Sequence, residues 1–363
     1  MEAFEIAERV RYLDDLKLRT SSIDVSKKNN YEAGLALNSL KISKELTPSI
    51  FLCLEETCSN LKLDIDQVNA YITSSPEIQA GCISFSKESC IITVTSAIIN
   101  LLDLEEMKFV LGHELGHFLL SHNLEQVDPL ETKEGYVKKR AQEISVDRLG
   151  LMACRDLNIA TRAMVKTLSG LDNRFINFDM NAFLNILEDD SLKENNSYQY
   201  SSHPSFILRA KALIRFSLSD PYLQITQDNS GTNLKDIDKL IQNDLNTFID
   251  RDLREDIKQS KDRVYFWGFA YSYIRNGNFS KEDQLRLGEK FDFQRVESLK
   301  GMLGSLTSKS EVLDTVKDKF VNSINILKEV APNLAKREVN LIIQEIAEES
   351  GHQDLFAEVL REL

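Results

Sequence analysis

Residues 103–123 read DLEEMKFVLGHELGHFLLSHN, and the rest of the chain is interpreted around this stretch. Its apolar residues fall on nearly every side of a helix, which predicts a helix buried all round. Asp103 can cap the first turn, and Glu106, three residues later, completes the pattern of a capping box. We therefore expect a fold built around one central, buried helix.

This helix carries His113, Glu114 and His117 in the spacing HExxH. The two histidines lie one helical turn apart, about 40° round the axis, so both imidazoles can reach one metal ion while Glu114 flanks it. Burying these groups without partners would be costly, and a zinc ion would supply the partner. The alternative is a pair of core histidines that hydrogen bonds satisfy. His122 would face away from the metal if the helix continued that far.

A catalytic zinc ion usually has three protein ligands, so a third must come from elsewhere in the chain. Glu143 is the leading candidate, because it lies on a second long helix expected at about 136–157. Asp147, one turn later, could accept a hydrogen bond from the other ring nitrogen of His113 or His117. The alternative for both carboxylates is an ordinary solvated helix face.

A small sheet is expected ahead of the HExxH helix, because residues 68–73, 82–86 and 90–95 are short runs rich in β-branched residues. The last of these strands leads directly towards the proposed metal. An exposed edge strand there could pair with an extended peptide, and an ordinary structural edge is the alternative. The expected substrate-binding residues are Ile92, Thr93, Val94 and Thr95.

The composition is that of an ordinary globular protein of 363 residues. With 44 basic and 57 acidic side chains the formal charge is −13, so neither a nucleic acid nor an anionic membrane surface is expected as a partner. The five cysteines are scattered, which indicates neither a disulfide framework nor a thiolate zinc site. No run of apolar residues is long enough to span a bilayer and the first residues do not read as a secretory signal, so a cytoplasmic location is expected.

Five stretches resemble, in order, the blocks of the HtpX-like and CAAX-prenyl-endopeptidase-like zinc metallopeptidases of the gluzincin type. They are NAY (69–71), IITVTS (91–96), DLEEMKFVLGHELGHFLLSH (103–122), EISVDRLGL (143–151) and SSHPSFILRA (201–210). The resemblance implies one zinc ion per chain with the ligands His113, His117 and Glu143, Glu114 as general base and Asp147 behind the ligands. It also implies that His203 stands near the attacking water or the developing oxyanion. Many relatives carry transmembrane helices or export signals, so their roles at membranes and in prenyl-protein processing are not carried over.

The expected fold class is α+β and predominantly helical. Residues 1–45 form an N-terminal helical segment, 46–216 a zincin-like metallopeptidase domain with a small sheet, 217–235 a linker rich in turn-forming residues, and 236–363 an all-helical domain. The expected function is that of a zinc metalloendopeptidase acting on proteins or peptides. The alternative is a catalytically silent or self-inhibited protein of the same fold that binds a protein partner through its C-terminal helices.

Overall fold

The computed structural model describes residues 2–15, 25–124, 133–187, 206–226, 229–245, 251–274 and 278–351. The chain divides into two compact units, which are taken separately below. Unit 1 comprises Met1–Val127 with Tyr136–Ile249, and unit 2 comprises Asp128–Gly135 with Asp250–Leu363. Within the described ranges, every helix is too short or too polar to cross a bilayer.

Helix α5 (Leu104–Leu119) is the centre of unit 1 and carries the HExxH residues. The expected capping box is present, since Asp103 accepts a hydrogen bond from the Glu106 amide at 2.9 Å and Glu106 accepts one from the Asp103 amide at 2.8 Å. The neighbours of this helix on different sides include α1 (Ala3–Val10), α3 (Pro48–Asn60), α7 (Leu157–Ser169), β3 (Ala80–Ser84) and β4 (Cys90–Thr95). It is therefore buried as its sequence predicts.

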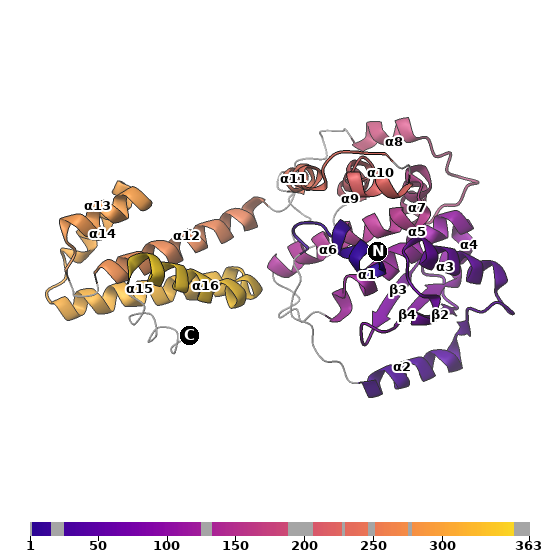
Figure 1. Ribbon diagram of the computed structural model, residues 1–363, viewed down its shortest axis with the longest axis horizontal. Helices are drawn as coiled ribbons and strands as arrows, with labels where there is room; N and C mark the ends of the chain where they lie inside the picture. Colours follow the sequence, from indigo (N-terminus) through magenta and orange to yellow (C-terminus); the bar gives the residue numbers. More distant parts are fainter. Residues whose placement is uncertain are drawn as a thin grey trace. The chain divides into compact units, whose positions relative to one another are not determined.

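The sheet of unit 1 has four strands in the order β1-β2-β4-β3. Their bounds are Leu40–Lys41, Val68–Thr73, Ala80–Ser84 and Cys90–Thr95 for β1 to β4. Strands β2, β3 and β4 are labelled in Figure 1. The sequence predicts β4 as an exposed edge, but β4 is central, parallel to β2 on one side and antiparallel to β3 on the other. The backbone of Ile92, Thr93, Val94 and Thr95 is thus paired on both sides and cannot accept a substrate strand. The edge beside α5 is β3.

Helix α6 (Lys133–Cys154) approaches α5 closely because glycines stand at the contact. A Cβ atom on Gly112 would overlap Cβ of Ala153, and one on Gly150 would lie 2.8 Å from the Phe109 carbonyl oxygen. No side chain larger than hydrogen fits at these positions without moving a helix. The glycines therefore set the distance between the two helices that carry the candidate metal ligands.

The remaining helices of unit 1 include two from the segment expected as a linker, residues 217–235. Helix α10 lies within it and α11 begins in it, and Ser219 forms a β-bridge with Thr232. Helix α11 is packed against α9 through Ile237, Ile241 and Leu208. The division between the units comes later, after Ile249. The bounds are α2 Val25–Asn38, α4 Ser96–Leu101, α8 Met180–Leu187, α9 Phe206–Phe216, α10 Asp220–Thr226 and α11 Leu234–Leu245.

The described part of unit 2 is all helical, and α12, α15 and α16 lie side by side (Figure 1). Its core is built of aliphatic and aromatic side chains such as Phe269, Phe320 and Ile346. The bounds are α12 Arg251–Tyr273, α13 Lys281–Lys290, α14 Phe293–Leu303, α15 Lys309–Val330 and α16 Pro332–Ser350. Together the two units confirm the expected α+β, predominantly helical fold class.

Candidate metal centre

Three side chains from α5 and α6 converge in unit 1. Nε2 of His113 lies 3.7 Å from one carboxylate oxygen of Glu143, and Nε2 of His117 lies 3.7 Å from the other. One ligand atom from each of the three residues falls within 4.8 Å of the others. Glu143 is thus brought to the histidines, and the close contact of α5 with α6 at the glycines places it there.

The donor set and its spacing suit zinc. Two imidazole nitrogens and one carboxylate are a common catalytic zinc set. Ligand atoms about 2.0–2.1 Å from a tetrahedral zinc ion lie roughly 3.4 Å from each other, close to the 3.7 Å separations found here. Both histidines also have their Nδ1 atoms in contact with other groups, so that Nε2 is the nitrogen facing the cluster.

Asp147 supports His113. Its Oδ1 lies 3.0 Å from Nδ1 of His113, and it accepts two hydrogen bonds from Arg209 of α9, at 2.6 and 2.8 Å. Burial alone would raise the pKa of Asp147, but Arg209 and His113 hold this pKa below its ordinary value. An ionised Asp147 must accept, so Nδ1 of His113 donates, and in the neutral ring Nε2 then carries the lone pair. Arg209 also lies 3.6 Å from Glu143, which links both carboxylates.

His122 supports His117, which differs from the expectation that His122 faces away. Helix α5 ends at Leu119, and Ser121 has a left-handed backbone with φ of 61°, which turns the chain back. As a result Nδ1 of His122 lies 3.0 Å from Nδ1 of His117, and Nε2 of His122 lies 3.0 Å from Oδ2 of Asp15. The His122 ring is buried between these two groups.

The electrostatics of the two histidines differ. For His113, burial would lower the pKa, but Asp147, Glu143 and Glu114 raise it above its ordinary value. For His117, burial together with the neighbouring His113 and His122 lowers the pKa to about 3. His117 is therefore neutral at physiological pH, the form in which an imidazole can bind a metal.

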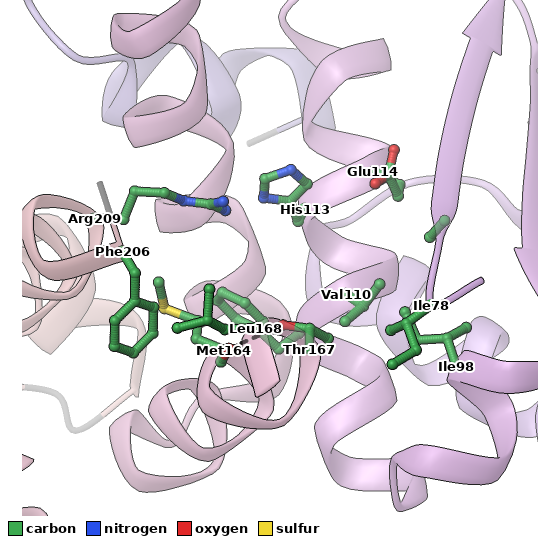
Figure 2. Close-up of a pocket in the computed structure, with 12 residues that line it drawn as sticks. Ile78, Ile98, Val110, His113, Glu114, Met164, Thr167, Leu168, Phe206 and Arg209 are labelled. Carbon is green, nitrogen blue, oxygen red and sulfur yellow. Dashed lines mark hydrogen bonds between the residues drawn. The ribbon is translucent and has the colours of Figure 1, made fainter. Parts of the chain in front are cut away.

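Glu114 stands beside the cluster but is not part of it. Burial, and then the charge of Glu143, raise the pKa of Glu114, while His113, Arg209 and a hydrogen bond from the Cys82 backbone oppose the rise. Figure 2 shows its carboxylate between α5 and the neighbouring strand. A buried carboxylate whose pKa lies above the ordinary value is suited to accept a proton and release it again.

An apolar pocket of about 340 Å³ opens next to His113 and Glu114. Met164, Leu168 and Phe206 gather on one side of it in Figure 2, with Ile78 and Ile98 on the other. The guanidinium of Arg209 points towards the His113 ring at one end of this pocket (Figure 2). The full lining is Ile78, Ala80, Ile98, Phe109, Val110, His113, Glu114, Met164, Thr167, Leu168, Phe206 and Arg209.

The edge strand β3 has backbone groups directed away from the sheet. The Thr95 amide donates to the Gln79 carbonyl at 3.0 Å, so in the antiparallel pattern Gly81 also faces β4 while Ala80 and Cys82 face outward. The outward carbonyl of Cys82 accepts a hydrogen bond from the Asn123 side chain at 2.8 Å. Ala80 lines the pocket beside His113 and Glu114.

Several of these residues were not expected from the sequence as site residues. Arg209 lies in the quoted stretch SSHPSFILRA. A buried Asp147 requires a cation as its partner, and this requirement points to an arginine such as Arg209. No sequence pattern points to Asp15, because it lies 107 positions from His122 and only the folded chain brings the two together. His203 was expected near the reacting groups and lies outside the described residues.

A helical α+β unit with an HExxH helix and a His-His-carboxylate cluster has the fold class of a zincin-like metallopeptidase. Residues 48–131 match the family described as Peptidase family M48. Plastoglobule-localized metallopeptidase 48, chloroplastic, from Arabidopsis thaliana is 24% identical over 188 residues, 44% of this chain and 55% of the relative. The chain thus spans about half the length of that relative. No solved structure matches. The two matches confirm the expected resemblance to a metallopeptidase family.

Proposed function

We propose that the chain is a zinc-dependent endopeptidase that cleaves proteins or peptides. The observation that carries this proposal is the cluster of His113, His117 and Glu143, with both Nε2 atoms facing the carboxylate. These three residues would hold one zinc ion. When bound, zinc supplies a Lewis acid that polarises the scissile carbonyl and lowers the pKa of the attacking water.

Glu114 is the general base in this proposal. Its carboxylate takes a proton from the water during attack and then delivers it to the leaving amine. Its raised pKa, due first to burial, makes the carboxylate a stronger base and so favours the first of these steps. His203 keeps the role implied by the resemblance, donating a hydrogen bond to the developing oxyanion.

The substrate would bind in an extended form along the edge strand β3. Strand β4, which the sequence predicts for this role, is already paired on both sides. The substrate backbone would hydrogen-bond to the outward groups of Ala80, and one of its side chains would enter the apolar pocket. This arrangement favours a substrate with a large apolar residue next to the scissile bond.

The cytoplasmic location and a protein partner of unit 2 remain predictions. The Arabidopsis relative is, by its name, chloroplastic.

The test is zinc analysis of the purified chain together with cleavage of a peptide library. Glu114→Gln should lower kcat/KM by about 10²–10⁴ while zinc stays bound. Glu105→Gln is the matched control, because Glu105 is exposed on the same helix and pairs with Lys108 at 2.7 Å. Glu143→Ala should reduce bound zinc. Cleavage by the Glu114→Gln variant at the wild-type rate would contradict the general-base role. Full zinc occupancy in Glu143→Ala would show that Glu143 is not a zinc ligand.

A further inference from the structure

The two candidate zinc-binding histidines are held in different ways. His113 contacts a carboxylate directly, through Asp147, and an arginine, Arg209, holds that carboxylate. His117 contacts a second imidazole, His122, and only His122 contacts a carboxylate, Asp15. The second support is thus one residue longer than the first.

We propose that Asp15 and His122 are positioning residues that fix the ring orientation and the tautomer of His117 for zinc binding. This inference rests on the proposed zinc site, since it assigns a role to groups behind one of its ligands. Groups hydrogen-bonded to the far nitrogen of a ligating histidine generally fix its tautomer and strengthen it as a ligand. Here an entire imidazole is placed between the ligand and its carboxylate.

The order of protons along this chain of contacts follows from its last member. Burial would raise the pKa of Asp15, but His122 and then Arg11 hold this pKa low, so Asp15 is an ionised acceptor. Nε2 of His122 must therefore carry the hydrogen that Asp15 accepts at 3.0 Å. In a neutral ring this leaves Nδ1 of His122 as an acceptor. Nδ1 of His117 then donates to it at 3.0 Å.

The consequence is that Nε2 of His117 is left with its lone pair directed at the cluster. The reverse order would place a proton on Nε2 of His117, facing Glu143, where that nitrogen could not bind a metal. It would also set the bare Nε2 of His122 against a carboxylate oxygen, two acceptors at 3.0 Å. With both rings neutral and Asp15 ionised, only this arrangement of hydrogens satisfies both contacts.

The N-terminal segment is fastened where this role requires it. Arg11 lies 3.2 Å from Oδ1 of Asp15 and donates to the Leu120 carbonyl, at the end of α5, at 2.8 Å. The Tyr12 amide donates to the hydroxyl of Ser145 on α6 at 3.0 Å. Asp15 is therefore held against both helices that supply ligands. It lies outside residues 48–131, the part of the chain that matches the family.

The experiment measures the zinc affinity of the full chain by competition with a chelator, with no peptidase assay. His122→Phe keeps the ring but removes both nitrogens, and should weaken zinc binding by about 10–100-fold. Asp15→Asn keeps an acceptor oxygen and removes the charge, so its loss should be smaller than that of His122→Phe. Asp244→Asn is the matched control, because Asp244 pairs with Arg215 at 2.9 Å in the same unit, and it should leave zinc affinity unchanged.

A second measurement needs no variant. Nitrogen-15 NMR of the wild-type imidazoles, in a chain with 5 histidines, should show His117 protonated at Nδ1 and His122 at Nε2. The opposite tautomers would overturn the inference, as would a His122→Phe variant whose zinc affinity is within about threefold of wild type. In either case the proposed peptidase could still stand. A wild-type chain that binds no zinc would instead overturn the proposed function and the inference together.

Discussion

The interiors of the two units differ in where they place charge. Among the described residues, unit 1 buries several charged side chains, including Glu106, Glu143, Asp147, Arg148 and Lys166. The buried polar side chains described in unit 2 are serines only. Buried charges are costly unless they are paired, so a stable fold does not need them. In unit 1 these charges are paired, as in Glu106 with Lys166 and Arg148 with Asp238, or lie at the candidate metal centre.

The largest effect is expected at Glu106, in the first turn of α5. It is fully buried and pairs with Lys166 at 2.7 Å, and Lys166 is buried as well. Glu106→Gln leaves that ammonium without its counter-charge and should destabilise the protein by about 3–5 kcal/mol. Calorimetry of the full chain measures this. A loss below about 1 kcal/mol, typical of an exposed pair, would contradict the claim that the buried charges of unit 1 depend on their partners.

The close approach of α5 and α6 gives the next effect. Gly112→Ala would drive its Cβ into Ala153, so it should destabilise unit 1 by about 1–3 kcal/mol and lower zinc affinity. Gly34→Ala on α2 is the control, because nothing lies within 4 Å of its added Cβ. The control should be neutral or stabilising by roughly 0.5–1 kcal/mol. Denaturant unfolding measures the stability of both variants, and chelator competition measures their zinc affinity. Equal effects of the two substitutions would show that the glycine contact does not position the zinc ligands.

A smaller effect is expected in the pocket beside Glu114. Thr167→Phe would fill part of its 340 Å³, lowering kcat/KM about tenfold for peptides with a large apolar residue at the scissile bond. Peptides with alanine there should be little affected. Ser169→Phe, on the same helix but outside the pocket lining, is the control. An equal fall in kcat/KM for both kinds of peptide would show that the pocket does not select the substrate side chain.

The smallest effect is expected in unit 2. Glu338 pairs with Lys261 at 2.6 Å, nearly the distance of the Glu106–Lys166 pair, but both partners are partly exposed. Glu338→Gln should therefore cost about 0–1 kcal/mol and leave zinc affinity unchanged. Trp267, the single tryptophan of the chain, lies in α12 and reports unfolding of unit 2 by fluorescence. A loss as large as that of Glu106→Gln would show that burial does not separate the two pairs.

Local features were predictable from the sequence. The capping box of Asp103 and Glu106 lies within four residues, and the start of α5 is as expected. The HExxH spacing likewise places His113 and His117 on one side of a helix through its period alone. Glu143 required one further step, that a second helix packs against the first, and the glycines at the contact make that packing possible.

Features that depend on distant segments were not predictable in the same way. Strand order is set by which strands meet in space. The sequence therefore predicts β4 as an edge, although β3 pairs with it in the sheet. His122 was expected to face away because a continuing helix was assumed, and the turn at Ser121 breaks that assumption. Asp15 and His122 lie 107 positions apart, and no local pattern connects them.

The backbone of Ser121 has a consequence for recognising such sites. A left-handed φ of 61° directly after the helix returns the next side chain to the helix that has just ended. Glycine, asparagine or serine tolerates that conformation better than a β-branched residue. The pattern HExxH followed by four residues and a histidine, with a residue of this kind just before the last histidine, can therefore be searched for in other chains. Each match predicts a paired imidazole behind the second histidine of the motif.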